Sequence, residues 1–562
     1  MREPHCAIKP VGVRSRAWYR PVFDVVGLAE RQVPISYFET MRTSRICRGL
    51  VIAASALALV SCATAIEPDG PATTADLFDF GYKNISERYI EQVDLSRVSI
   101  AGLNSLSQID PNLSVSSEAG LVRLNAADVT ASQWPTPDRA DAAGWARVVS
   151  QAVDAARVAS PEARKKSAND LSNVVFRGVM SNFDRYSRYS GPRLARRNRA
   201  MREGFGGLGI TIRYADGTTH VDKVHPDTPA SRAGLRPNDV ITRVDGVHIE
   251  GLGQAEVITV LRGQIGSEAK LVVRRSGLRK TVAVSVTRAL IIPPTVTASR
   301  VKQILTLKIS SFNQGTAAAV SRELSRAERE MGSILQGVVL DLRNNPGGLL
   351  DQAVSVVDLF LADGLVISTR GRHPRSHQVF DATWGELIPD VPVVVLVNGK
   401  SASAAEIVAV ALRDRGRAVV IGSASYGKGT VQTIISLPNK GELTLTWARM
   451  HAPSGFALQD HGIIPAICTS SDTEGVAKLV GALRASRRAG TDLLENRLKA
   501  RLARRSDPQL SRAACPPHAK EPAADMAIAR YLFQDHRLYT RTLVIGRPAV
   551  AERPRNDARA RP

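Results

Sequence analysis

Residues 400–432 read KSASAAEIVAVALRDRGRAVVIGSASYGKGTVQ, and this stretch decides the fold of the second half of the chain. Apolar residues recur at helical spacing after Ser403, which predicts a helix that begins there. The apolar run AVVIG over 418–422 predicts a buried strand, and Lys428 follows it in a turn between two glycines. The stretch therefore places a serine at a helix N-terminus and a lysine beside a buried strand.

Both positions suit a Ser–Lys catalytic pair. The N–H groups at a helix N-terminus lack intrahelical partners and favour negative charge, which suits a nucleophile whose attack creates an oxyanion. Serine is also a preferred N-cap, so Ser403 alone indicates only a capped helix. A lysine desolvated beside apolar strands has a lowered pKa and is a base at neutral pH, so Lys428 favours the catalytic interpretation.

The same stretch has a second interpretation, a nucleotide phosphate loop. Residues 422–428 match the pattern G-x-x-x-x-G-K. That loop needs Ser or Thr directly after the lysine to bind magnesium, whereas this chain has Gly429, with Thr430 one place late. We therefore expect no nucleotide site, no metal and no cofactor. Either His451 or His461 could in principle be the histidine of a Ser-His triad, but we expect surface or structural roles for both.

Sequence periodicity divides the chain into regions. Strands and helices alternate over 297–475, which predicts an α/β domain with a largely parallel sheet. Period-two strands separated by Asp-Gly turns over 204–288 predict a compact, mainly β domain. Residues 75–200 carry apolar residues at helical spacing and predict a helical N-terminal region. Residues 476–562 form a basic region of helical pattern, whose last ten residues we expect to be disordered.

The N-terminus contains a second methionine followed by a secretory-type signal. Met41 precedes arginines and an apolar run, so 41–61 reads as a signal peptide and 1–40 as a non-native extension ahead of the true start. The signal ends in Leu-Val-Ser-Cys at Cys62, which looks like a lipoprotein box whose cysteine carries lipid, with 62–74 as a tether. An ordinary transmembrane anchor is the alternative, although the apolar run is short for a span.

Charge and cysteines fit a protein of the cell envelope. The formal net charge is +22, and residues 481–562 hold 18 Lys and Arg against 8 Asp and Glu. No basic-aromatic motif accompanies this excess, so we expect no nucleic-acid binding but a solvated tail, or one near an anionic membrane. Beside the lipidated cysteine a mature chain keeps Cys468 and Cys515, which form either a disulfide or two buried thiols.

The stretch from 401 to 432 resembles the active-site signature of the C-terminal processing, or tail-specific, serine peptidases. In that family the serine and lysine lie 25 positions apart and a glutamine follows four positions after the lysine, and both spacings hold here. The resemblance implies Ser403 as nucleophile, Lys428 as general base and Gln432 as the residue that orients the lysine. It excludes Ser401, whose distance from the lysine differs.

Further segments extend this resemblance over most of 75–470. GVVLDLRNNPGG over 337–348 looks like a segment of the family that supplies backbone N–H groups to an oxyanion hole. FDRYSRYSGP resembles the stretch before the family's PDZ domain, and MHAPSGFALQDHGIIPAI resembles a core strand and loop, with Ala466 where an Asp is usual. That position lies outside the dyad. The implied oxyanion residues are Gly347, Gly348 and Ala404.

Residues 204–288 resemble a PDZ domain. GFGGLGITI matches the carboxylate-binding loop and following strand, and PASRAGLRPNDVITRVDG matches a second part of the domain. The resemblance implies that loop N–H groups hold a peptide's terminal carboxylate while the peptide pairs as an extra strand and a helix walls its side-chain pocket. The implied peptide-binding residues are Gly207, Leu208, Gly209, Ile210, Val257 and Leu261.

Together these features predict an α/β Ser-Lys peptidase core with an inserted, mainly β PDZ domain and an N-terminal helical region. We expect a serine endopeptidase on the periplasmic side of the envelope, held to the membrane through Cys62, that cleaves proteins with exposed C-terminal tails. A catalytically inactive PDZ scaffold is the alternative, and an adaptor tethered by its basic tail is a third hypothesis. The sequence leaves open whether the chain forms a homo-oligomer or binds an adaptor.

Overall fold

The structure, a computed structural model, describes residues 73–383, 385–470, 481, 512–513 and 515–546. The predicted extension, signal peptide, Cys62 and nearly all of the tether lie outside these residues, as does the predicted disordered end. Within the described part of the chain, no helix combines the length and the apolar composition that crossing a bilayer requires.

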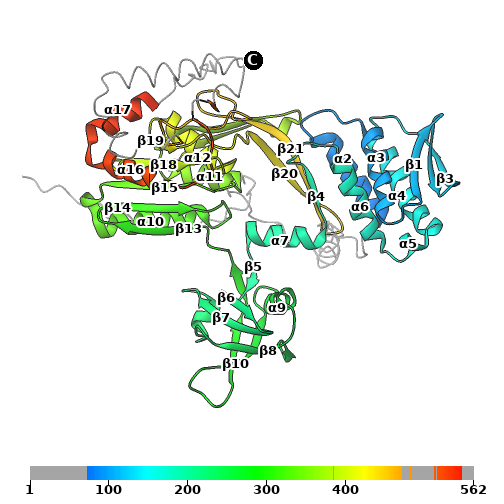
Figure 1. Cartoon of the computed structure of the whole chain (residues 1–562), viewed down its shortest axis with the longest axis horizontal. Coiled ribbons are helices and arrows are strands. Elements are labelled where there is room, and N and C mark those ends of the chain that lie inside the picture. Colours follow the sequence, from blue (N-terminus) through cyan, green and yellow to red (C-terminus); the bar gives the residue numbers. More distant parts are fainter. Residues whose placement is uncertain (1–72, 384, 471–480, 482–511, 514, 547–562) are drawn as a thin grey trace, which may run out of the picture. The chain divides into compact units, whose positions relative to one another are not determined.

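A six-stranded sheet forms the centre of the predicted α/β core (Figure 1). Pairing is parallel from β14 to β22, and β13 is an antiparallel edge strand. In spatial order the strands are β13 (Val296–Val301), β14 (Ile304–Ile309), β15 (Gly337–Asp341), β18 (Val393–Val397), β19 (Ala418–Gly422) and β22 (Ile467–Cys468). The predicted α/β class with a largely parallel sheet is confirmed.

Helices cover both faces of this sheet because its central strands are apolar on both sides. Val338 and Leu340 of β15 pack in the apolar core that includes α10, α11 and α12, whereas Val339 packs with α16 and α17. The helices are α10 (Thr316–Met331), α11 (Leu350–Asp358), α12 (Ala404–Asp414), α16 (Ala523–Gln534) and α17 (His536–Gly546). The C-terminal helices are therefore part of the core's packing.

A second sheet has the strand order β17-β16-β21-β20, with β4 paired to β21. Its strands are β4 (Arg188–Ser190), β16 (Gly364–Arg370), β17 (Gln378–Ala382), β20 (Thr430–Ser436) and β21 (Glu442–His451). The short helices η2 (Gly332–Ile334) and η3 (Pro374–Ser376) lie between the core elements. Since β20 begins two residues after Lys428, the β20–β21 hairpin fixes the end of the lysine turn.

The N-terminal region combines helices with a small antiparallel sheet that the sequence did not predict. Its helices are α2 (Thr74–Arg88), α3 (Leu95–Asn104), η1 (Ser105–Gln108), α4 (Ala142–Ala159), α5 (Pro161–Arg164), α6 (Ala168–Met180) and α7 (Pro192–Glu203). The sheet contains β1 (Leu113–Glu118), β2 (Leu121–Ala126) and β3 (Val129–Pro135). These strands escaped prediction because β1 buries only Leu113 and Val115 and β3 has no buried position, which gives a weak apolar signal.

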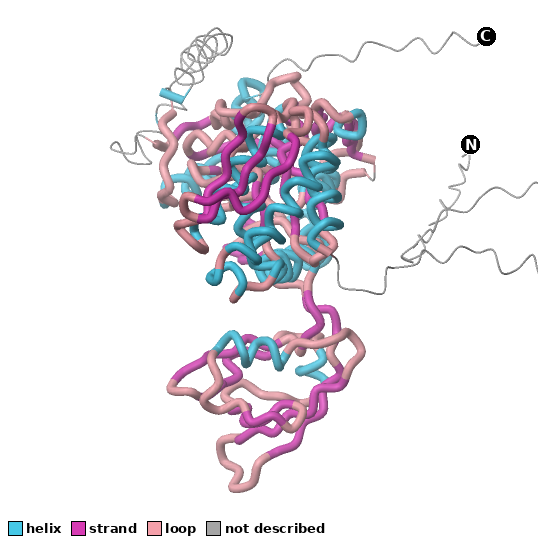
Figure 2. Tube along the Cα trace, turned by 90° about the vertical axis from the view of Figure 1, so that its right-hand side faces the viewer, coloured by secondary structure: helices cyan, strands magenta, loops and turns pink. Residues whose placement is uncertain are grey.

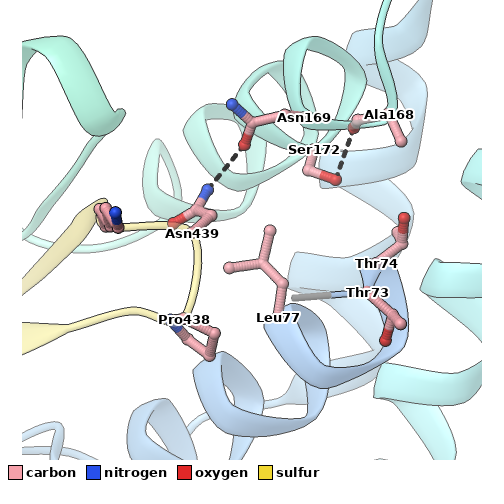
Figure 3. Close-up of a pocket in the computed structure, with 9 residues that line it drawn as sticks. Thr73, Thr74, Leu77, Ala168, Asn169, Ser172, Pro438 and Asn439 are labelled. Atoms are coloured by element: carbon pink, nitrogen blue, oxygen red, sulfur yellow. Dashed lines mark hydrogen bonds between the residues drawn. The ribbon is translucent and has the colours of Figure 1, made fainter. Parts of the chain in front are cut away.

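The N-terminal helices support the hairpin that follows the lysine turn. Leu443 and Leu445 of β21 are buried in the same apolar core as Trp145 and Phe176. At the hairpin turn, Asn439 donates its side-chain N–H to the side-chain oxygen of Asn169 at 2.8 Å (Figure 3). A cavity of about 360 Å³ opens there, and its lining is uncharged apart from one lysine: Thr73, Thr74, Leu77, Ala168, Asn169, Ser172, Pro438, Asn439 and Lys440.

The region over 204–288 is built mainly of strands, as predicted (Figure 2). Asp216-Gly217 and Asp245-Gly246 have positive φ at both residues, as two-residue hairpin turns require. The sheet order is β11-β10-β8-β7-β6. Its elements, with two flanking strands, are β5 (Phe205–Gly207), β6 (Ile210–Ala215), β7 (Thr218–Val224), α8 (Pro229–Arg232), β8 (Val240–Val244), β9 (Val247–His248), α9 (Gln254–Leu261), β10 (Glu268–Arg274), β11 (Val282–Thr287) and β12 (Ala289–Ile291).

Candidate functional site

Ser403 occupies a sharp turn between β18 and α12. Its backbone has φ 56° and ψ −117°, a conformation that residues other than glycine rarely adopt and that is typical of a nucleophile on a strand-to-helix turn. Ser403 is partly exposed, whereas Ser401 is fully buried and donates its hydroxyl to the carbonyl oxygen of Leu342 at 2.8 Å. The structure thus gives Ser401 a structural role and leaves Ser403 accessible.

The predicted oxyanion turn lies directly against the serine. A Cβ at Gly347 would stand 2.8 Å from the Cβ of Ser403 and 3.0 Å from the backbone nitrogen of Ala404, so only glycine allows this approach. The N–H of Gly347 donates to Oδ1 of Asn345 at 2.8 Å and is therefore already engaged. Within the Gly347-Gly348 turn, the N–H of Gly348 is therefore the better candidate donor, and its role and that of Ala404 in an oxyanion hole stay predictions.

Lys428 lies in the turn between β19 and β20. Strand β20 begins at Thr430, so no helix follows the lysine and the geometry of a nucleotide phosphate loop is absent at this position. The neighbouring glycines allow another segment to pass closely, since a Cβ at Gly429 would stand 2.0 Å from the backbone nitrogen of Gln459. The turn that carries Lys428 therefore packs closely against the segment around Gln459.

One buried carboxylate joins the serine turn to the lysine turn. Oε2 of Glu406 accepts the N–H of Ser403 at 2.7 Å and the N–H of Lys428 at 3.0 Å. Oε1 accepts the N–H of Gly427 at 2.7 Å and the hydroxyl of Ser425 at 2.5 Å. The backbone nitrogens of Ser403 and Lys428 both donate to this one oxygen. They therefore lie no farther apart than the combined length of the two hydrogen bonds. The structure thus holds the backbones of Ser403 and Lys428 close to each other, and a hydrogen bond between their side chains stays a prediction.

Glu406 itself was missed by the sequence reasoning. It lies three residues after Ser403, in the Ser-x-x-Glu pattern of a capping box, and that pattern could have singled it out. The side chain is fully buried. Burial raises the pKa of the Glu406 carboxyl, and its hydrogen bonds act in the opposite direction because they stabilise the ionised form.

The environment of Lys428 lowers the pKa of its amine. Burial is the largest influence and, together with the positive charge of Arg188, lowers the pKa of Lys428 to about 8, while the charges of Asp184 and Glu406 oppose this shift. The ring of Tyr186 lies 4.9 Å from Nζ and also favours the charged form. A pKa near 8 leaves roughly a tenth of the amines neutral at pH 7, as a general base requires.

Gln432 is held by two threonines on neighbouring strands. Its Nε2 donates to the hydroxyl oxygens of Thr430 at 3.0 Å and Thr446 at 3.1 Å. The Thr446 hydroxyl in turn donates to Asp184 at 3.0 Å, which links Gln432 to a carboxylate that acts on Lys428. The network fixes the amide near the lysine turn, and the direct orientation of Lys428 by Gln432 stays a prediction.

The implied peptide site lies on the edge strand β6. This strand pairs with β7 and is the last in its sheet, so its other edge is open to strand addition. Val257, Leu261 and Leu208 are buried in the adjoining apolar core, and Ile210 packs against it. Peptide binding by these residues, and by Gly207 and Gly209, stays a prediction.

An arginine that the sequence reasoning missed lies beside the glycine-rich loop. The guanidinium of Arg262 stacks on the ring of Phe205 at 3.7 Å, and the next residue, Gly263, donates its N–H to the carbonyl oxygen of Gly206 at 3.1 Å. Burial lowers the pKa of Arg262, and within the described residues no carboxylate acts on it. A partly desolvated cation is therefore present where a terminal carboxylate is expected to bind.

Cys468 and Cys515 form a disulfide, which decides between the two alternatives that the sequence left open. The bond joins the end of β22 to the residues that precede α16. His451 and His461 do not sit in the turns that carry Ser403 and Lys428: the first lies at the end of β21, and the second packs on Phe456 at 5.3 Å between ring centres.

Comparison with known families gives two matches. Residues 303–469 match peptidase family S41, and residues 206–286 match the PDZ domain. A carboxy-terminal-processing protease of Bartonella bacilliformis is 40% identical over 292 residues, which cover 52% of this chain and 67% of the relative. A probable CtpA-like serine protease of Staphylococcus aureus is 32% identical over 306 residues, and the chain spans 60% of that relative's length.

Solved structures that match part of this chain include a photosystem II D1 C-terminal processing protease. It is 23% identical, with a TM-score of 0.35, and the match covers 70% of this chain and 92% of the other. The PDZ domain of a carboxy-terminal protease from Vibrio cholerae, solved with a peptide, is 26% identical with a TM-score of 0.15. That match covers 16% of this chain and 96% of the other.

Replacing Arg188 by Gln should raise the pKa of Lys428 above about 8, because the substitution removes the positive charge that disfavours the ammonium form. Burial remains, so the pKa should stay below the ordinary lysine value. Competitive labelling of Lys428 by trace acetic anhydride across pH, read by mass spectrometry, measures the shift. Arg193→Gln, at an exposed arginine of α7, is the matched control. An unchanged labelling midpoint in Arg188→Gln contradicts the assigned cause.

Proposed function

The chain belongs to the carboxy-terminal-processing serine peptidases of family S41, and from this premise we propose that Ser403 and Lys428 are its catalytic dyad and that it cleaves envelope proteins whose C-terminal tails its PDZ domain binds. The observation that carries the proposal is the carboxylate of Glu406, which bonds the backbones of both dyad residues. A serine at a helix N-terminus and a lysine in a glycine turn occur widely. Their fixation by one buried side chain is not expected of unrelated turns.

The geometry supports acyl transfer through a covalent intermediate. The neutral amine of Lys428 takes the proton of the Ser403 hydroxyl as its oxygen attacks the peptide carbonyl carbon. The oxyanion that forms faces the N–H groups of Gly348 and Ala404 at the start of α12, where the helix dipole also favours negative charge. Collapse of this intermediate breaks the C–N bond, and Lys428 returns the proton to the leaving amine. Water activated by the same amine then hydrolyses the acyl-enzyme.

The PDZ domain supports a role in substrate capture. A tail that pairs with β6 would satisfy the open strand edge, and its terminal carboxylate would meet the loop at 207–209 with Arg262 beside it. The apolar residues next to this edge favour an apolar side chain at the end of the tail. Protein substrates with exposed, apolar C-termini are therefore the class that we propose.

Location and assembly belong to the same proposal. The signal-like sequence before Cys62 supports a lipoprotein held on the periplasmic side of an envelope membrane, and a disulfide between Cys468 and Cys515 suits an oxidising compartment. A PDZ scaffold without activity is the alternative function. The lowered pKa of Lys428 and the strained turn at Ser403 favour catalysis, since a scaffold has no need of either. A homo-oligomer or an adaptor partner is compatible with both.

Ser403→Ala and Lys428→Ala should each reduce cleavage about 10⁴-fold or more, because neither the nucleophile nor the base can be replaced by water in this site. The measurement is kcat/KM for a fluorescently labelled, unfolded protein with an apolar C-terminal tail. Wild-type kcat/KM should rise with pH up to about 8 and then level off, since Lys428 acts in its neutral form. Ser333→Ala, at an exposed serine of η2, is the matched control and should keep its activity. Equal cleavage by wild type and Ser403→Ala would refute the dyad.

Amidating the C-terminus of a tail peptide should weaken its binding about tenfold or more, because the amide removes the charge that the loop and Arg262 hold. Arg262→Gln should weaken the binding of the free-acid peptide by a similar factor and should weaken the binding of the amidated peptide much less. Fluorescence anisotropy of labelled peptides with full-length Ser403→Ala protein measures both affinities. Arg279→Gln, at an exposed position of the same domain, is the control. Equal affinity of wild type for the acid and the amide contradicts carboxylate recognition.

A further inference from the structure

The C-terminal residues 515–546, called here the C-terminal cap, lie beyond the segment that matches the peptidase family. Helices α16 and α17 of the cap cover one face of the core sheet (Figure 1). Phe533 packs so tightly that a Cβ at Gly337 would stand 2.5 Å from its ring. The hydroxyl of Tyr539 accepts the N–H of Val393 at 2.9 Å and donates to its carbonyl oxygen at 3.1 Å. The cap is thus fixed on the strands that lead into the catalytic turns.

The link between the disulfide and α16 contacts the serine turn directly. The carbonyl oxygen of His518 accepts the N–H of Gly399 at 2.7 Å. The side chain of Asn398 donates to the carbonyl oxygens of Ala519 at 3.4 Å and Lys520 at 3.3 Å. These contacts lie four and five residues before Ser403, on the residues that connect β18 to the nucleophile turn.

The same link contacts the lysine turn. The carbonyl oxygen of Cys515 accepts the N–H of Ala424 at 3.4 Å, and the N–H of His518 donates to the hydroxyl of Ser423 at 3.3 Å. Just before the link, Arg512 donates to the carbonyl oxygens of Ser425 at 3.1 Å and Tyr426 at 2.9 Å. Backbone positions two to four residues before Lys428 are therefore held by the C-terminal chain.

Two acidic residues of the cap hold the third catalytic turn. Asp525 is buried and accepts from Arg343 at 3.1 Å and from Thr469 at 2.7 Å. Glu521 accepts from the side chain of Asn344 at 2.5 Å. Arg343 and Asn344 belong to the loop that leads to Gly347 and Gly348. All three turns of the site, those of the oxyanion glycines, the serine and the lysine, are thus in contact with one short segment.

From these contacts we propose that the C-terminal cap is a positioning element of the peptidase site and that the Cys468–Cys515 disulfide makes its seating, and with it the activity, sensitive to dithiol reductants. The activity part rests on the proposed function. The disulfide is the covalent bond that ties the link to β22, because residues 468 and 515 are 47 positions apart in the chain. Without it, the link is kept in place by hydrogen bonds and helix packing, and closing so long a loop costs conformational entropy.

The redox step is an exchange with a small dithiol such as dithiothreitol. One thiolate of the reagent attacks a protein sulfur and breaks the S–S bond, and its second thiol closes the reagent to a cyclic disulfide. The protein gains two electrons and two protons as two cysteine thiols. No other reactant is needed, and a disulfide oxidant such as oxidised glutathione reverses the change.

The test compares full-length oxidised, reduced and reoxidised protein with the double variant Cys468→Ser/Cys515→Ser. Reduction should lower kcat/KM for the tail-bearing substrate about tenfold, because small displacements of catalytic groups are costly. It should also raise the apparent pKa of the pH profile above about 8, as a looser turn admits water to Lys428. Hydrogen exchange should quicken at residues 398–403 and 422–428 and stay unchanged in the PDZ domain at 206–286. Reoxidation should restore all three readouts.

The double variant should resemble the reduced protein and show no response to dithiothreitol. Unchanged activity on reduction overturns the proposal, as does a further tenfold loss when dithiothreitol is added to the double variant, or a loss of protection that includes the PDZ domain. If the oxidised protein shows no cleavage that depends on Ser403, the proposed function fails, and hydrogen exchange alone then judges the cap. Faster hydrogen exchange confined to residues 398–403 and 422–428 supports the positioning role of the cap. Unchanged hydrogen exchange in both turns contradicts that role.

Discussion

The carboxylate of Glu406 is the interaction on which the site depends, because it bonds two turns that are distant in the sequence. Ser403 is the N-cap of α12 and Lys428 follows β19, and neither element alone determines where the other lies. Four donors converge on the two oxygens of one buried side chain. A buried carboxylate with this many partners has a single well-defined position, so the hydrogen bonds that satisfy it also hold the backbone of the serine turn next to the backbone of the lysine turn.

The surrounding fold maintains two energetically unfavourable features that the same residues would not keep in an isolated peptide. Ser403 keeps a positive φ, which costs free energy and persists because Ser401, Gly347 and α12 confine the turn from several sides. Lys428 keeps a lowered pKa because burial and Arg188 disfavour its charge. Both conditions are unfavourable for stability and useful for acyl transfer. The contacts of the C-terminal cap with the same turns show that the support extends well past the residues that carry the chemistry.

The sequence predicted most of what local patterns encode. The alternation of strands and helices in the core, the Asp-Gly turns of the PDZ domain and the positions of Ser403 and Lys428 all follow from periodicity and turn chemistry. The strands β1 to β3 were missed because β1 and β3 bury few residues, which leaves a weak apolar signal. Glu406, Arg262 and the C-terminal contacts were missed because their roles arise from residues brought together only by the fold. The hydrogen bond from the N–H of Gly347 to the side chain of Asn345 was also missed, because it depends on the conformation of the loop.

The most direct test of this account is kcat/KM of Glu406→Gln, with Glu328→Gln on the exposed face of α10 as the matched control. Glutamine keeps the size of glutamate but replaces one acceptor oxygen with an N–H₂ group, which must then face N–H donors that the carboxylate satisfied. The account predicts a loss of about 10²-fold or more in Glu406→Gln protein that is still folded, with a free energy of unfolding lowered by about 1–3 kcal/mol, and no change in the control. Wild-type activity in a folded Glu406→Gln protein would contradict it.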